Sequence, residues 1–100
     1  MLPEAIPDGI LIPSEAIGMK DLAELYRRSV RTLQRAFKKC HVYKAIGERY
    51  GFDFTPQQQL MIFYLYFPPP KYYKSYMWLE QTGYIEIMAK KYGLDRFKQR

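Results

Sequence analysis

The chain has 100 residues, of which 48% are hydrophobic and 26% charged, and this composition is typical of one small folded domain rather than of a disordered tail. A domain of this length holds a modest core, but it is too small for a deep catalytic cavity with its own lid. The single cysteine excludes an internal disulfide and fits a reducing cytosol.

The net charge of +6 is unevenly distributed along the chain. Residues 1–26 carry five acidic side chains and one lysine, for −4, whereas residues 27–50 carry eight basic side chains and one acidic one, for +7. Residues 51–100 carry seven basic and four acidic side chains, for +3. A local cluster of cations is either a solvated face or a site for a polyanion such as nucleic acid.

The first 18 residues contain three prolines and two glycines, and the turn signal Pro7-Asp8-Gly9 precedes the short apolar run Ile10–Ile12. We expect residues 1–18 to form an extended arm that packs either along its own domain or on a partner. No signal peptide is visible in this segment. The longest apolar run, Leu60–Phe67, is far shorter than the roughly 20 residues of a membrane span, so we expect a cytoplasmic protein without membrane contact.

A short amphipathic helix is predicted over residues 19–27, where Leu22, Ala23, Leu25 and Tyr26 supply the apolar side chains. The small Ala23 would allow another helix to approach closely. A turn follows this helix.

A second helix is predicted over residues 29–39, with Ser29 as its N-cap and lysines at the end that suits the helix dipole. At about 100° per residue, the apolar and cationic side chains of this segment separate onto opposite sides. The apolar side comprises Val30, Leu33, Ala36 and Phe37, and the cationic side comprises Arg31, Arg35, Lys38 and Lys39.

The segment LAELYRRSVRTLQRAFKK, residues 22–39, resembles the helix-turn-helix DNA-binding superfamily, whose usual pattern reads L-A-x-x-x-G-V-S-x-x-T-L-x-R. The matching positions are Leu22, Ala23, Ser29, Thr32, Leu33 and Arg35.

Two positions depart from that pattern. Arg27 stands at the turn glycine and Arg28 at a small buried apolar residue. Either Arg27 adopts a left-handed backbone, at a cost of about 1 kcal/mol, or the turn is remodelled. Val30 would then supply the missing apolar contact from a neighbouring position.

After Lys39, the spacing of Val42 and Ile46 predicts one more helical turn before Gly47. The neighbouring Cys40 and His41 do not predict a metal site, because a structural zinc needs four ligands and the chain has no other cysteine or histidine. We expect a half-buried cysteine beside a solvent-exposed histidine.

Residues 50–54 alternate apolar and polar side chains, which predicts a short extended piece such as a wing or hairpin. The next helix begins sharply, with Thr55 as N-cap, Pro56 at the first helical position and Gln58 placed to close a capping box. It is predicted to continue to about Tyr66, and the prolines at 68–70 end it.

The helix that follows Thr55 is apolar on almost every side. Its expected core stripe, at i, i+3, i+4 and i+7, comprises Leu60, Phe63, Tyr64 and Phe67. Because Met61, Ile62 and Leu65 leave little polar surface, this helix is either central to the fold or half of a dimer interface.

The chain has a pair of short helices, then the helix start at Thr55, then an apolar helix ended by proline. This order is similar to the order in small helix-turn-helix proteins of mobile elements and phages in gut bacteria. The matching residues are Phe54, Thr55, Pro56, either Gln57 or Gln58, and Pro68. This resemblance extends over roughly residues 18–69 and implies DNA binding without naming a site.

The last 30 residues predict two helices, one to about Thr82 and one over residues 84–92 that Gly93 closes. Lysines interleaved with tyrosines suit a stacking platform for unpaired bases. In the alternative, the tyrosines pack this tail onto the domain or onto a partner.

Together these patterns predict a mainly α fold: an extended proline-rich arm over 1–18, a helix-turn-helix domain over 19–70, with or without a short wing or hairpin, and a helical tyrosine-rich tail over 71–100. The resemblance and the cationic side of residues 29–39 indicate a duplex DNA-binding protein, which would be a transcriptional regulator or an excision or recombination accessory factor of a phage or mobile element. We expect Arg31, Gln34, Arg35 and Lys38 to approach base edges or nearby phosphates, and Arg27, Arg28, Ser29, Thr32 and Lys39 to hold the DNA backbone.

Reading of half-sites would require a homodimer or another protein partner, through Leu60, Phe63, Tyr64 and Phe67 or through the tail. The alternative function is a structural or adaptor subunit of a phage particle, where it would reside in the virion, or of a packaging or replication assembly. We expect no enzyme, cofactor or metal, since the sequence has no phosphate loop, one histidine and no paired carboxylates.

Overall fold

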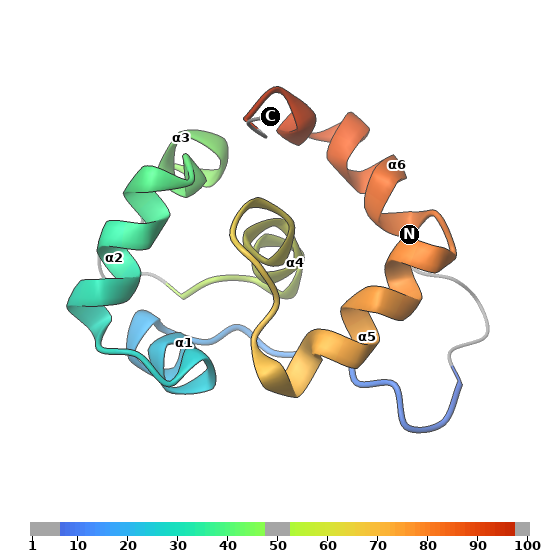
Figure 1. Ribbon diagram of the computed structural model, residues 1–100, viewed down its shortest axis with the longest axis horizontal. Coiled ribbons are helices and arrows are strands. Elements are labelled where there is room, and N and C mark those ends of the chain that lie inside the picture. Colours follow the sequence, from blue (N-terminus) through green and yellow to red (C-terminus); the bar gives the residue numbers. More distant parts are fainter. Residues whose placement is uncertain (1–6, 48–52, 98–100) are drawn as a thin grey trace.

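The computed structural model describes residues 7–47 and 53–97, and within them the chain is mainly helical, as the sequence predicts. Helices surround α4, which lies at the centre of Figure 1 and is seen nearly along its axis. The helices are α1 (Met19–Tyr26), α2 (Val30–Lys39), α3 (Val42–Ile46), α4 (Pro56–Leu65), α5 (Pro70–Gln81), α6 (Tyr84–Lys91) and the short 3-10 helix η1 (Leu94–Phe97).

The start of α4 has the predicted capping box. The Gln58 amide donates to Thr55 Oγ1 at 3.1 Å, the Thr55 amide donates to Gln58 Oε1 at 3.0 Å, and Pro56 occupies the first turn. The helix ends at Leu65, one residue before the predicted end. Its central position follows from its sequence, because six of its ten residues are buried: Gln59, Leu60, Met61, Ile62, Phe63 and Leu65.

The predicted stripe on α4 is wrong at its last position. Phe67 is 41% exposed because the helix has already ended, so helical spacing from Leu60 no longer sets its direction. Leu60 and Phe63 are 4% and 1% exposed and belong to the chain's own core. These two side chains are therefore not available to a partner, and Tyr64 is half-buried.

The chain passes from α4 into α5 through three consecutive prolines at 68–70, which have no amide hydrogen, and Pro70 is the first residue of α5. The hydroxyl of Tyr26, at the end of α1, donates to the carbonyl oxygen of Phe67 at 2.5 Å. Burial raises the pKa of the Tyr26 phenol, so the hydroxyl keeps its proton and remains a donor. A side chain from α1 thus holds the backbone just before the proline run.

The tail helices share one hydrophobic core with the rest of the chain. α5 packs on α1 and α6, and both α6 and η1 pack on α4. Leu79 of α5 and Leu94 of η1 are fully buried in the same cluster as Leu22 of α1. The tyrosines take different places in this packing, since Tyr76 is buried and Tyr73 is 57% exposed.

The described part of the arm, residues 7–18, lies along its own domain. The amide of Leu11 donates to Ser75 Oγ at 2.8 Å, and Ile17 exchanges backbone hydrogen bonds of 3.1 and 2.8 Å with Phe54. This isolated antiparallel bridge is the described end of the predicted wing at 50–54, and residues 50–52 lie outside the described residues. In the described ranges no strand forms, so Phe54 pairs with the arm instead of with a hairpin partner.

Gln59 fastens the arm to α4. Its side chain is 1% exposed, and its Nε2 donates to the carbonyl oxygens of Glu15 at 2.8 Å and Phe54 at 3.0 Å. One amide group therefore links three segments of the chain.

We predict that Gln59→Leu lowers the free energy of unfolding by about 1–3 kcal/mol, because the Glu15 carbonyl oxygen loses a donor and the Phe54 carbonyl oxygen keeps only the Ile17 amide. Urea denaturation followed by circular dichroism measures this change. The matched control is Gln81→Leu at the exposed end of α5, which should change stability by less than about 0.5 kcal/mol. A Gln59→Leu protein as stable as the wild type would contradict the assignment.

Candidate nucleic-acid interface

The turn between α1 and α2 contains a left-handed residue that is not glycine. Arg27 has φ 56° and ψ 43°, so the left-handed alternative is the correct one. The amides of Arg27 and Arg28 donate to the carbonyl oxygens of Glu24 and Ala23, each at 3.0 Å. These bonds satisfy the end of α1 and reverse the chain toward α2.

α2 begins at the predicted cap. The amide of Thr32 donates to Ser29 Oγ at 3.1 Å, and the Ser29 hydroxyl donates to Thr32 Oγ1 at 2.9 Å. Both hydroxyl groups are therefore engaged in starting the helix. Val30 is half-buried and packs against the core, which fits the predicted replacement of the missing apolar contact.

The underside of α2 is buried as predicted, because Leu33 and Phe37 are fully enclosed. The Phe37 ring contacts Phe54 and Tyr66, each with ring centroids 6.2 Å apart, and Tyr43 at 5.9 Å. These contacts fix the rotation of α2 about its axis.

The opposite side of α2 forms a cationic ridge, which we define as Arg31, Arg35, Lys38 and Lys39. All four side chains are exposed. No carboxylate that the structure describes forms an ion pair with them. Their charge is therefore available to a ligand rather than neutralised by the acidic residues of the arm or of α1.

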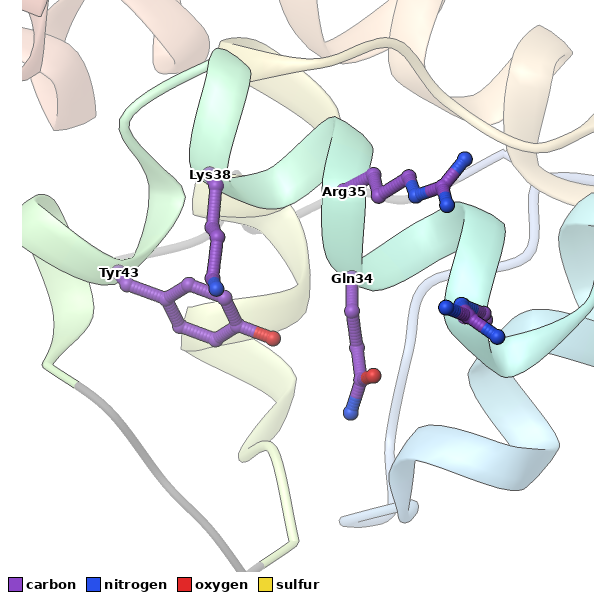
Figure 2. A pocket seen from close by; sticks show the side chains of 5 residues that line it. Gln34, Arg35, Lys38 and Tyr43 are labelled. Carbon is purple, nitrogen blue, oxygen red and sulfur yellow. The ribbon is translucent and has the colours of Figure 1, made fainter.

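Four of the nine predicted contact residues lie together around one hollow of about 260 Å³ (Figure 2). They are Arg31, Gln34, Arg35 and Lys38, and Tyr43 of α3 is the fifth described residue that lines it. We call these five residues the basic hollow. The other five predicted contacts do not line it: Arg27, Arg28, Ser29 and Thr32 lie toward the amino end of α2, and Lys39 lies at its carboxyl end.

Tyr43 is the site residue that the sequence reasoning missed. α3 is placed beside α2 by a turn in which His41 has φ 64°, and nothing in the sequence of residues 40–43 indicates that left-handed residue. Helical spacing alone does not bring residue 43 next to residues 31–38. The sequence offers one signal for Tyr43, which is that this tyrosine lies a few residues after the cationic helix.

The expectation for Cys40 and His41 is only half correct. Cys40 is half-buried, as predicted. His41 is also half-buried, and its ring stacks on Phe97 of η1 with centroids 5.8 Å apart, a contact between residues far apart in the chain. Within the described residues, no three side chains of His, Cys, Asp or Glu gather as metal ligands.

A second hollow, of about 510 Å³, has the opposite charge. It lies among the arm, α1 and α5, and Glu15, Asp21 and Glu24 are on its walls, with Lys71 as the one basic side chain among the described residues that line it. Its acidic walls would repel a phosphate backbone. The larger hollow is thus not the candidate nucleic-acid site.

Across residues 7–47 and 53–97, none of the helices is both long enough and apolar enough to cross a membrane.

We predict that Arg27→Gly raises the free energy of unfolding by about 1 kcal/mol, because glycine adopts the left-handed backbone without steric cost. Urea denaturation measures the change. Lys74→Gly, at an exposed position inside α5, is the control and should lower stability by about 1 kcal/mol. A loss of stability in both variants would show that the left-handed residue at 27 carries no strain.

Comparisons of this chain with protein-family models, with curated proteins and with solved structures found no match.

Proposed function

We propose that this protein binds duplex DNA and that α2 enters the major groove. The observation that carries the proposal is the exposed cationic ridge, which no described carboxylate neutralises and which the buried Leu33 and Phe37 hold outward. Phosphates provide the complementary charge, and the release of their counterions favours binding.

The dimensions of α2 suit this placement. A helix with its side chains is about 10–12 Å across, and the major groove is about 12 Å wide. The ten residues of α2 span about 15 Å, which is enough to follow several base pairs.

Arg31, Gln34 and Arg35 are the residues we assign to base edges. Arginine offers paired donors to guanine, and the glutamine amide offers a donor and an acceptor to adenine. Lys38 acts mainly as a point charge for a phosphate.

The flanking residues hold the DNA backbone. Arg27 and Arg28 are exposed before the amino end of α2, and Lys39 is exposed at its carboxyl end. Ser29 and Thr32 contribute through the helix start that they fix, because their hydroxyl groups already bond to each other. Contacts of this kind set orientation and register rather than sequence preference.

Recognition of paired half-sites requires a second copy of the chain or another protein. Leu60 and Phe63 are enclosed in the core, so the exposed apolar side chains are the ones we assign to this contact. Outside the arm, which contributes Leu11, the described residues of this kind are Phe67, Tyr73, Ile87 and Tyr92.

The resemblance to helix-turn-helix proteins of mobile elements and phages supports a role as a transcriptional regulator or as an excision or recombination accessory factor.

A second candidate function is that of a structural or adaptor subunit, and the exposed apolar side chains favour it. Leu11, Tyr73 and Ile87 are 52%, 57% and 59% exposed, which is the kind of apolar surface that protein partners cover.

We predict that the double substitution Arg31→Ala and Arg35→Ala weakens binding to a pool of random-sequence duplexes by about a hundredfold or more at moderate salt. The reason is the loss of two cations from the ridge, and circular dichroism should show an unchanged fold because both side chains are exposed. Fluorescence anisotropy over a salt series measures affinity and its salt dependence.

The matched control for the double variant is Lys90→Ala with Lys91→Ala, which removes two exposed cations from α6. This control should retain binding within about threefold, since α6 contributes no predicted contact with DNA. Unchanged affinity and unchanged salt dependence in the Arg31 and Arg35 variant would refute the proposal.

Light scattering separates DNA binding from the adaptor function. For a DNA-binding protein, we expect no assembly larger than a dimer without nucleic acid and a further increase in mass when a duplex is added. An adaptor should form large assemblies without nucleic acid, and the double substitution on α2 should leave them intact. The second result would favour the adaptor function over the proposed one.

A further inference from the structure

We infer that α6 is the contact between two copies of this chain, which pair through it in antiparallel orientation about a two-fold axis. The inference rests on the proposed function only in that paired half-sites call for a second copy. It names the surface that the second copy uses, and its test needs no DNA.

α6 turns one side to the core and the opposite side to solvent. Ile85, Met88 and Ala89 are 2%, 2% and 3% exposed, whereas Ile87 is 59% exposed and Tyr92, the C-cap residue, is 41% exposed. Ile87 is the most exposed large hydrophobic side chain that the structure describes. Because one exposed apolar side chain is ordinary on a protein surface, the surrounding charges decide what covers it.

The charged residues of α6 are ordered by sign. Glu86 lies in the first turn, and Lys90 and Lys91 lie in the last turn. The Lys91 ammonium lies over the Tyr92 ring, 5.5 Å from its centroid. Glu86 and Lys90 are both exposed, and neither forms an ion pair with any residue that the structure describes, although their spacing of four residues would allow one between them. Both charges are therefore available to a second molecule.

An antiparallel pair of α6 helices makes these charges self-complementary. Glu86 and Lys90 lie about 40° apart around the helix and about 6 Å apart along it, so they share one side of its exposed face. A two-fold axis level with Met88, midway between them, places Glu86 of each copy opposite Lys90 of the other. The same axis brings the two Ile87 side chains together, because each lies only about 1.5 Å from it along the helix.

The order of the charges also excludes the parallel arrangement and favours a second copy over a different protein. A parallel pair would place Glu86 opposite Glu86 and Lys90 opposite Lys90, and it would align the two helix dipoles unfavourably. In the antiparallel pair, the same surface supplies both members of each ion pair. This property is what an interface between identical chains requires.

The size and place of α6 set the strength and the shape of the dimer. Its eight residues span about 12 Å, which is less than an interface of standard size needs, so the dimer dissociates on dilution. Figure 1 shows α6 at the edge of the molecule, with α4 between it and α2. Pairing at α6 therefore leaves the cationic ridge of each copy uncovered.

The first test is sedimentation equilibrium of the protein alone, over a concentration series from about 5 μM to about 1 mM. The wild type should pass from the mass of one chain to that of two. Ile87→Asp should weaken dimerisation at least tenfold, because it places two carboxylates together at the axis. Leu11→Asp is the matched control: Leu11 is 52% exposed on the arm, so this variant should dimerise as the wild type does. Circular dichroism checks that both variants fold.

The second test exchanges the charges. Glu86→Lys alone opposes two lysines at each pair, and Lys90→Glu alone opposes two glutamates, so each variant should dimerise roughly fivefold more weakly than the wild type, or worse. An equimolar mixture of the two variants restores one lysine and one glutamate at each pair. We expect this mixture to dimerise at least as tightly as the wild type, by the same measurement.

Three results would overturn the inference. A wild type that stays monomeric at the highest concentration makes no such contact, and an Ile87→Asp variant that dimerises normally places the contact elsewhere. A mixture that dimerises no better than its two components excludes the antiparallel pairing. A random-sequence duplex has no paired half-sites, so its binding does not require α6. A monomer that binds such duplexes therefore leaves the proposed function standing, and a dimer that binds none refutes that function alone.

Discussion

The packing of the Phe37 ring is the interaction on which the arrangement of this molecule depends. This fully buried side chain of α2 meets Tyr43 of α3, Phe54 just before α4 and Tyr66 just after it. The Phe37 ring therefore connects α2 to α3 and to the residues at both ends of the central helix α4. Because an α-helix has fixed angular spacing, enclosing Phe37 and Leu33 turns Arg31, Arg35 and Lys38 toward solvent.

The separation of charge along the chain also appears on its surface. Cations line the hollow between α2 and α3, and carboxylates line the hollow among the arm, α1 and α5. These charges do not pair with each other across the described residues, so the two hollows keep opposite potentials. A polyanion would meet attraction at one surface and repulsion at the other, which favours one orientation of the protein on DNA.

The parts of the fold that the sequence predicts are those set by residues three or four positions apart. Thr55 with Gln58, and Ser29 with Thr32, form caps through local hydrogen bonds, so residue type and spacing are sufficient to locate them. Exposure of the cationic ridge follows from the same periodicity. At Arg27 the sequence pattern allows either a left-handed residue or a remodelled turn. The observed φ of 56° shows that the residue is left-handed.

The features that the sequence does not predict depend on long-range packing or on a single turn. Helical spacing places Phe67 in the core, but this spacing does not hold past the end of α4, and Phe67 is exposed. The stacking of His41 on Phe97 joins α2's end to the last helical turn described, and no local pattern indicates it. Tyr43 joined the candidate site only because His41 adopts a left-handed backbone, a conformation unusual for a residue other than glycine.

The Tyr26 hydrogen bond to the carbonyl of Phe67 has a consequence for the thermodynamics of association. It ties α1, the support of the candidate recognition helix, to a proline run that has little conformational freedom of its own. A support that rocked freely would have to be immobilised when DNA arrived, and the affinity would fall by that entropic cost. Here the immobilisation takes place during folding, so the surface that we propose for the groove is preorganised.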